Sequence, residues 1–320
     1  MRALRNLIDP YLLLLLGTIA LAAILPARGA GVPIADGAVT VAVGLLFFLY
    51  GARLAPQAVW QGLANWRLQA VVFLSTFLLF PLIGLGVMHL TSRVVAPDIA
   101  VGLLFLCLLP STVQSSIAFT SIARGNVPAA LCSASLSNLI GVALTPLLTA
   151  LLLPTSGEGA ISASSIESIA MQILLPFVAG QLLRPLIGDF LARHKTLVGY
   201  VDRGSILLVV YAAFSAGVVA GVWTQLAPID LAIVLVIDLA ILALVIVITT
   251  VASRRLGFTT EDEITIVFCG SKKSMASGIP MATILFAGHA VSLIVLPLML
   301  FHQAQLFVCA TLARRYAARP

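Results

Sequence analysis

The stretch CGSKKSMASGIP, residues 269–280, places two adjacent lysines in the middle of an apolar run. The residues ITIVF precede it and MATILFAG follow it, so the whole segment is long enough to span a bilayer. A charged side chain at the centre of a membrane costs about 2.5–3.5 kcal/mol on insertion scales, and such residues usually have a function. The stretch therefore predicts a membrane span with a polar, functional centre.

The composition indicates an integral membrane protein. Of the 320 residues, 61% are hydrophobic and only 9% are charged, against roughly 25% charged residues in a soluble domain. The chain is too apolar for an outer-membrane barrel, whose strands alternate with polar lumen residues. The net charge of +6 does not indicate nucleic-acid binding, because the basic residues are scattered between spans. The four cysteines lie in apolar runs and are interpreted as packing residues.

Ten membrane spans are expected, because runs of about 20 apolar residues are needed to cross a bilayer. The first run resembles a signal peptide in length, but further spans follow it and it is interpreted as the first helix. The predicted spans cover residues 10–26, 37–54, 68–89, 99–123, 127–153, 165–185, 201–223, 229–253, 261–287 and 290–312.

The basic residues predict the orientation of these spans. With ten spans and a cytoplasmic N-terminus, Arg28 and Arg93 are the only Lys or Arg residues on the outer side. The two lysines inside span nine belong to neither side, and all other Lys and Arg residues lie on the cytoplasmic side. Cytoplasmic loops carry an excess of Lys and Arg, so this bias supports both the number of spans and their direction. We expect a multi-pass protein of the plasma membrane (the inner membrane in a bacterium) with both termini in the cytoplasm.

Ten spans divide into two halves, residues 1–155 and 160–320. Because five is odd, the second half enters the membrane in the opposite direction, as in inverted-repeat transporters. ARGNVPAAL at 123–131 and FAGHAVSLI at 286–294 are similar, and each follows an interrupted span. The expected fold class is an all-α polytopic membrane protein with ten transmembrane helices in two inverted five-helix repeats.

Spans four and nine are interrupted by polar residues. In span four, Pro110 removes a backbone donor and a polar run follows it; in span nine, Gly270, Gly278 and Pro280 surround a polar centre. Backbone groups freed within a membrane must be satisfied by polar side chains, water or a substrate. Paired breaks in the two halves indicate a transport site. The alternative is a simple proline kink with packing through small residues.

The residues around both breaks resemble the bile acid:sodium symporter family, and more narrowly its SBF-like branch. The resemblance is carried by LLPSTVQSSIAFTSIARGNVPAALCSASLSN at 108–138 and FCGSKKSMASGIPMATILF at 268–286. It implies two broken helices that cross within a core domain. The implied domains are a panel of residues 10–54 and 165–223 and a core of residues 68–153 and 229–312.

The sodium symporters of that family bind two sodium ions beside the crossing, and this sequence departs from their pattern. Where they have a glutamate and then a Gln-Asn pair in span nine, this chain has Phe268 and then Lys272 and Lys273. Ser115 and Ser116 match their Ser-Asn pair. The resemblance thus implies a site that has lost a carboxylate and gained positive charge. A weak sodium site at Ser115, Ser116, Ser137 and Asn138 is retained as an alternative, and no other cofactor is expected.

Asp238 is the only charge in the run LAIVLVIDLAILALVIVITT of span eight, and by the repeat it corresponds to position 75, beside Thr76. A pair between Asp238 and a lysine would lower the cost of both buried charges, either as a stabilising contact or as a proton- or anion-linked site. Burial disfavours the charged form of lysine, so that a buried lysine can exchange a proton near neutral pH. We predict that Lys272, with Lys273 as the less favoured candidate, takes the place of a coupling sodium ion.

The predicted function is secondary active transport of a small organic anion by alternating access, proton-linked or cation-independent. The alternatives are a sodium-dependent symporter of bile-acid-like substrates and a regulatory protein of calcium homeostasis without flux of its own. An enzyme is not expected, because the motifs of intramembrane serine and aspartyl proteases and of prenyltransferases are missing. The partners expected are the lipid bilayer and a small anion but no nucleic acid, and the oligomeric state is left open.

The predicted site gathers polar residues from several spans. His302 is alternatively a packing histidine. The predicted substrate- or ion-binding residues are Thr76, Gln114, Ser115, Ser116, Ser133, Ser137, Asn138, Asp238, Lys272, Lys273, Ser274, His302 and Gln303, and the helix-break residues are Pro110, Gly270, Gly278 and Pro280.

Overall fold

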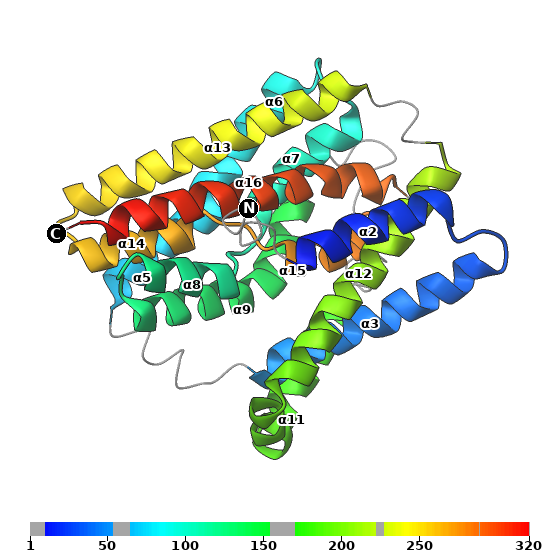
Figure 1. Ribbon diagram of the computed structural model, residues 1–320, viewed down its shortest axis with the longest axis horizontal. Coiled ribbons are helices and arrows are strands. Elements are labelled where there is room, and N and C mark those ends of the chain that lie inside the picture. Colours follow the sequence, from blue (N-terminus) through cyan, green and yellow to red (C-terminus); the bar gives the residue numbers. More distant parts are fainter. Residues whose placement is uncertain (1–9, 54–64, 154–169, 222–226, 288, 320) are drawn as a thin grey trace, which may run out of the picture. The chain divides into compact units, whose positions relative to one another are not determined.

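The structure is a computed structural model that describes residues 10–53, 65–153, 170–221, 227–287 and 289–319 (Figure 1). Within these ranges every regular element is a helix. Because a helix satisfies its backbone hydrogen bonds within one segment, it is suited to a bilayer. Seven described helical stretches are long and apolar enough to cross one, so the protein is a multi-pass membrane protein. They are Gly31–Arg53, Trp66–Thr91, Val127–Leu152, Met171–Arg193, Lys195–Val219, Pro228–Arg255 and Val291–Ala317.

The chain forms two compact units. Unit 1 consists of Met1–Leu54, Ile161–Leu226 and Ile279–Leu293, and unit 2 of Ala55–Ala160, Ala227–Gly278 and Ile294–Pro320. Each unit thus contains segments from both halves of the sequence, and contacts between residues far apart in the chain hold each unit together.

Unit 1 is built around two helices that cross at glycines. Gly51 lies against the backbone of Phe177, and Gly180 lies against the backbone of Phe48, which leaves no room for a side chain at either glycine. Small residues allow such close approach of helices in membranes. The helices of unit 1 are α2 (Pro10–Ile24), α3 (Gly31–Arg53), η2 (Ala170–Leu174), which continues as α11 (Leu175–Arg193), and α12 (Lys195–Val219).

Unit 2 holds both interrupted segments. In Figure 1 its helices α13 (yellow), α14 (orange) and α16 (red) run alongside one another. The helices that contribute to it are α5 (Trp66–Leu74), η1 (Ser75–Leu79), α6 (Phe80–Thr91), α7 (Pro97–Leu108), α8 (Gln114–Ile122), α9 (Val127–Leu152), α13 (Pro228–Arg255), α14 (Thr260–Gly270), the start of α15 (Met275–Leu285) and α16 (Val291–Ala317) from Ile294 onward.

Sequence signals explain the helix ends that position the breaks. The Asn126 side chain accepts a hydrogen bond from the Ala129 amide and caps α9, and Thr259 caps α14 in the same way through Asp262. The first turn of α14 is acidic, which suits the positive end of its dipole. The wide turn η1 precedes Pro81, whose missing N–H removes an ordinary helical bond, and the Phe80 amide bonds Ser75 five residues earlier.

The predicted spans and the observed helices agree in part. Seven predicted spans correspond to the seven long apolar stretches, although α3 starts before residue 37 and α11 continues through Pro185 to Arg193. The other three predicted spans correspond to α2 and to two pairs of short helices, α7 with α8 and α14 with α15. The boundary between the predicted halves lies outside the described residues. The ten-span count and the inverted repeat stay predictions.

The glycine crossing in unit 1 gives a first testable prediction. Gly51→Ala should lower the thermal unfolding midpoint of the purified protein in detergent, because the new methyl group collides with the Phe177 carbonyl. Overpacking of this kind costs about 1–3 kcal/mol. Gly37→Ala in the same helix is the control, since nothing lies within 4 Å of its added carbon. Equal midpoints for the two variants would contradict the tight crossing.

Candidate functional site

The first break separates α7 from α8 at residues 109–113. Pro110 disfavours helical backbone at the residue before it, and Leu109 is extended with φ of −76° and ψ of 155°. The helix ends there, so the carbonyl groups of residues 107–111 have no partners within a helix. Inside a membrane these oxygens need donors from elsewhere.

All five of these carbonyl oxygens accept a hydrogen bond from another segment of unit 2. The Lys273 ammonium supplies two donors, two come from other side chains and one is a backbone amide. The bonds run from Lys273 Nζ to Cys107 O (2.9 Å) and Leu109 O (2.7 Å), from Thr145 Oγ1 to Leu108 O (2.9 Å), from Ser274 N to Pro110 O (2.8 Å) and from Asn138 Nδ2 to Ser111 O (2.6 Å).

The second break separates α14 from α15 at residues 271–274, and hydroxyl groups satisfy its carbonyls. Three consecutive oxygens at the end of α14 each accept a bond from a serine. Ser116 Oγ donates to Phe268 O (3.0 Å), Ser111 Oγ to Cys269 O (2.6 Å) and Ser75 Oγ to Gly270 O (2.9 Å). Because Ser111 belongs to the first break and Ser274 of the second bonds Pro110, each break satisfies part of the other.

The second break is shorter than predicted. Gly278 and Pro280 were expected to disrupt the helix, but both lie within α15. A side chain at Gly278 would collide with Leu109 and Leu298, so this glycine permits close packing against the first break. Proline inside a membrane helix is tolerated where neighbouring groups adjust to its missing bond. Pro110 lies within the first break, and Gly270 is the last residue of α14, directly before the second break.

Lys273 is completely buried at the C-terminal end of α7. Its Nζ donates to the carbonyl oxygens of Thr76, Cys107 and Leu109 at 2.9, 2.9 and 2.7 Å. An ammonium has three donors, so all of them are used. The ammonium also lies 4.0 Å from the centre of the Phe80 ring, at a cation–π distance. The carbonyl end of a helix favours a cation, and this one is filled by a cation attached to the chain.

Lys272 is equally buried but less extensively bonded. Its Nζ donates one bond, to the Ser115 carbonyl at 2.9 Å. The ammonium lies 4.1 Å from the Phe119 ring centre and 5.3 Å from that of Phe268. Aromatic faces attract a desolvated cation by about 2 kcal/mol. Lys272 is thus held mainly by two rings and one carbonyl.

The two lysines divide the predicted role differently from the expectation. The contacts to several carbonyl groups, expected first of Lys272, are made by Lys273. The reason is the local backbone: both lysines lie in the non-helical segment 271–274, so helical geometry does not determine which of them points to α7.

Asp238 lies in α13 and is completely buried. Neither carboxylate oxygen has a hydrogen-bond partner among the described residues, and no ion pair there joins it to Lys272 or Lys273. The expected Lys–Asp pair is therefore absent from this part of the chain.

The remaining predicted residues differ in their surroundings. Asn138 connects the breaks, since it donates to Ser111 O and accepts from Ser277 Oγ at 2.9 Å. Ser137 Oγ accepts from the Ser111 amide at 3.0 Å. His302 and Gln303 are half-buried, and Gln114 is exposed. Those that are buried are Thr76, Ser116, Ser133, Ser137 and Ser274, while Ser115 and Asn138 are half-buried. No cluster that would hold a metal ion through His, Cys, Asp or Glu occurs in the described ranges.

Two buried glutamines were missed by the sequence reasoning. Gln305 accepts from the Lys273 amide at 3.0 Å and donates to the Lys273 carbonyl at 3.1 Å, and its Nε2 lies 2.9 Å from His302 Nδ1. Gln305 lies three residues after His302, which places both on one helix face, and this spacing was the available signal. Gln69 accepts from Ser133 Oγ at 2.8 Å.

Replacing Gln305 should destabilise the protein at the second break. Gln305→Leu leaves the buried amide and carbonyl of Lys273 without partners, and each such loss costs about 1–3 kcal/mol. We expect a clearly lower thermal unfolding midpoint in detergent. Gln303→Leu is the matched control, because Gln303 lies two residues away on the same helix and is half-exposed. Similar midpoints for the two variants would show that the Gln305 bridge does not stabilise the break.

The chain matches the SBF-like CPA transporter family over residues 9–318. It is 55% identical to "Uncharacterized protein PA2026" of Pseudomonas aeruginosa, over 98% of this chain and 95% of that protein. It is 50% identical to "Putative symporter YfeH" of Escherichia coli K12, over 97% of this chain and 93% of that protein. Identity to "Sodium/bile acid cotransporter 7" of Rattus norvegicus is 31%, over 85% and 81% of the two chains.

The protein is a membrane transporter by family. It belongs to the SBF-like CPA transporter family, since the match covers nearly the whole chain. The resemblance inferred from the two break segments is confirmed.

Proposed function

We propose that this protein transports a small organic anion by alternating access and that it needs no sodium ion to do so. The observation that carries the proposal is the Lys273 ammonium, which donates to three backbone carbonyls at the end of α7. Membership of a transporter family supports a carrier rather than an enzyme. No cofactor is part of the proposal.

The ammonium stands where a transporter with broken helices places a coupling cation. In such transporters, unwound carbonyl groups and the C-terminal ends of half-helices coordinate the ion. Here the carbonyls of Cys107 and Leu109 and the end of α7 provide that environment, and Lys273 occupies it. A second cation at the same oxygens would be repelled at short range. The oxygens are therefore not free to bind sodium.

An anionic substrate fits the charges of the same region. Unit 2 buries the ammonium groups of Lys272 and Lys273 and two carboxyl groups, of which Glu263 is paired with Arg254 and only Asp238 could offset the lysines. The half-helices α8 and α15 begin directly after the two breaks, and the N-termini of half-helices favour anionic substrate groups. A relative is named for bile acids, which are organic anions, so taurocholate is the first probe for flux.

A proton remains available as the coupling ion. Proton coupling needs a group whose charge changes during the transport cycle. Asp238, which has no hydrogen-bond partner among the described residues, and Lys272, which has one, are the candidates. Lys273 is the least suited, because its three bonds favour the charged form.

The proposal includes the finer architecture expected from the sequence. It comprises ten spans in two inverted repeats, residues 1–155 and 160–320, with a panel and a core domain and both termini in the cytoplasm. A reporter enzyme that matures only in the cytoplasm should be active when it is fused after Pro320. A periplasmic or external signal at that position would reject the orientation.

The response to sodium tests the role of Lys273. The thermal unfolding midpoint of the wild type should be equal in sodium and potassium chloride of the same concentration. Lys273→Gln should lower the midpoint by the equivalent of about 3 kcal/mol, because charge-assisted bonds to three carbonyls are lost. Sodium should restore part of this loss where potassium does not, since the freed carbonyls can then coordinate it.

Lys272→Gln is the matched control for this experiment. It removes a neighbouring buried ammonium but leaves the three carbonyl bonds of Lys273 intact. No sodium-specific recovery is expected for it. Stabilisation of the wild type by sodium, or taurocholate uptake into proteoliposomes that requires sodium, would reject the proposal.

A further inference from the structure

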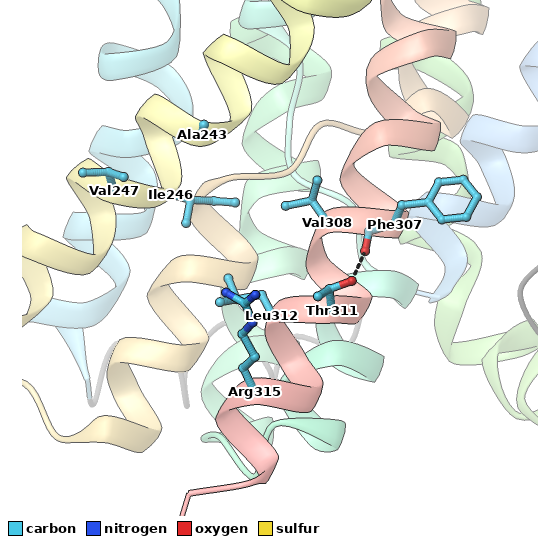
Figure 2. A pocket seen from close by; sticks show the side chains of 8 residues that line it. All are labelled: Ala243, Ile246, Val247, Phe307, Val308, Thr311, Leu312 and Arg315. Atoms are coloured by element: carbon cyan, nitrogen blue, oxygen red, sulfur yellow. Dashed lines mark hydrogen bonds between the residues drawn. The ribbon is translucent and has the colours of Figure 1, made fainter.

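A groove of about 470 Å³ lies between α13 and α16 on unit 2 (Figure 2). Two of its lining side chains are well exposed: Val247 is 57% and Phe307 is 48% accessible. None of its lining residues takes part in the carbonyl contacts of Lys273, and the proposed transport site does not use the groove. Its lining residues are Ala243, Ile246, Val247, Phe307, Val308, Thr311, Leu312 and Arg315.

The groove is apolar along its length and has a cation at one end. Thr311 is its only uncharged polar side chain, and its hydroxyl donates to the Phe307 carbonyl of the same helix at 3.1 Å, the bond drawn in Figure 2. The remaining polar group is the guanidinium of Arg315, which Figure 2 shows beside Leu312. A ligand that fits this lining has a hydrocarbon part and a negatively charged end.

Arg315 differs from two paired arginines at the same end of unit 2. Arg254 forms an ion pair with Glu263 at 2.8 Å, and Arg319 forms one with Glu261 at 3.0 Å. Arg315 makes no side-chain hydrogen bond or ion pair with the part of the chain that the structure describes. Its five donors are therefore open to an anion from outside the chain.

The cation lies where the two helices of the groove end together. Arg254 at the end of α13 and Tyr316 at the end of α16 both bond Glu263 at the start of α14. Ends of apolar helices lie near the headgroups of the bilayer. The groove thus extends from the headgroup level into the hydrocarbon, which is the orientation of a phospholipid.

We propose that the groove binds an anionic phospholipid, with one acyl chain along α13 and α16 and the phosphate on Arg315. Lipid tails are as apolar as the groove, so the hydrocarbon contacts alone give no preference over the surrounding bilayer. The preference comes from charge, because basic pockets between membrane helices bind anionic headgroups. A second copy of the chain is a poorer occupant, since a symmetric contact through this groove would bring two unpaired arginines together.

A bound lipid would also support the wall of the transport site. Leu312 lines the groove and packs against the cluster that contains Phe268. The Phe268 ring is one of the two that flank the Lys272 ammonium. The lipid is therefore in contact with a side chain only one layer away from Lys272. The lipid site itself stands independently of the proposed transport function.

Native mass spectrometry of the purified, delipidated protein tests the site. Phosphatidylglycerol and phosphatidylcholine with identical acyl chains are titrated separately, and the dissociation constant of the first bound lipid is measured. Phosphatidylglycerol should bind more tightly. Arg315→Gln should weaken its binding about five-fold, the effect of one juxtamembrane cation, and leave phosphatidylcholine unchanged.

Two further variants separate a groove from a charged surface. Arg314→Gln removes a neighbouring exposed arginine that does not line the groove, and it should keep the preference for phosphatidylglycerol. Ala243→Phe fills the groove from an exposed position and should weaken the first bound lipid of either kind. Equal losses for Arg314→Gln and Arg315→Gln, or no effect of Ala243→Phe, would overturn the proposal. An oligomer that Ala243→Phe dissociates would do so too, because the occupant would then be a second copy.

Discussion

The three hydrogen bonds from the Lys273 ammonium to backbone carbonyls are the contact on which the rest of unit 2 depends. Two broken helices meet in the buried interior of unit 2, where a freed carbonyl has no water to bond and leaving it unpaired costs several kcal/mol. Lys273 satisfies two carbonyls of the first break while belonging to the second. Its third bond, to Thr76, reaches the wide turn η1 that Pro81 produces. One side chain therefore connects three segments that are far apart in the sequence.

The serines and Gln305 satisfy further backbone groups at the second break. Hydroxyl groups satisfy the carbonyl groups at the end of α14, and Gln305 bonds both backbone groups of Lys273 from α16. A network in which each member is satisfied is rigid, whereas a partly satisfied one is costly. The breaks should therefore move together as one block. The less bonded groups are Asp238 and Lys272, and a change of charge or contact during transport is easiest at such positions.

Much of this arrangement could be predicted from residues 108–138 and 268–286. Proline and clustered serines within apolar spans indicate freed backbone, and a buried lysine pair indicates a function. The choice between Lys272 and Lys273 could not be made, because neighbours in a non-helical turn have no fixed relation to a helix face. The expected contact of Asp238 with a lysine is not formed for a related reason. Both ammonium groups bond backbone carbonyls instead, and the pattern of charged residues in a sequence does not show where backbone carbonyls are free. Gly278 was interpreted as a breaker although its lack of a side chain serves packing.

A tethered cation changes what coupling can mean in such a fold. A sodium ion leaves its carbonyl groups after each cycle, and its gradient then drives the next one. The Lys273 ammonium satisfies the same kind of oxygen atoms but is covalently attached, so it holds the two breaks together without carrying a gradient. Under the proposed function any energy input enters through another charge, and among the described residues of unit 2 Asp238 and Lys272 are the candidates. Under the proposed function, a lysine between the breaks thus separates two tasks, stabilising the broken helices and driving transport, that a bound ion performs together.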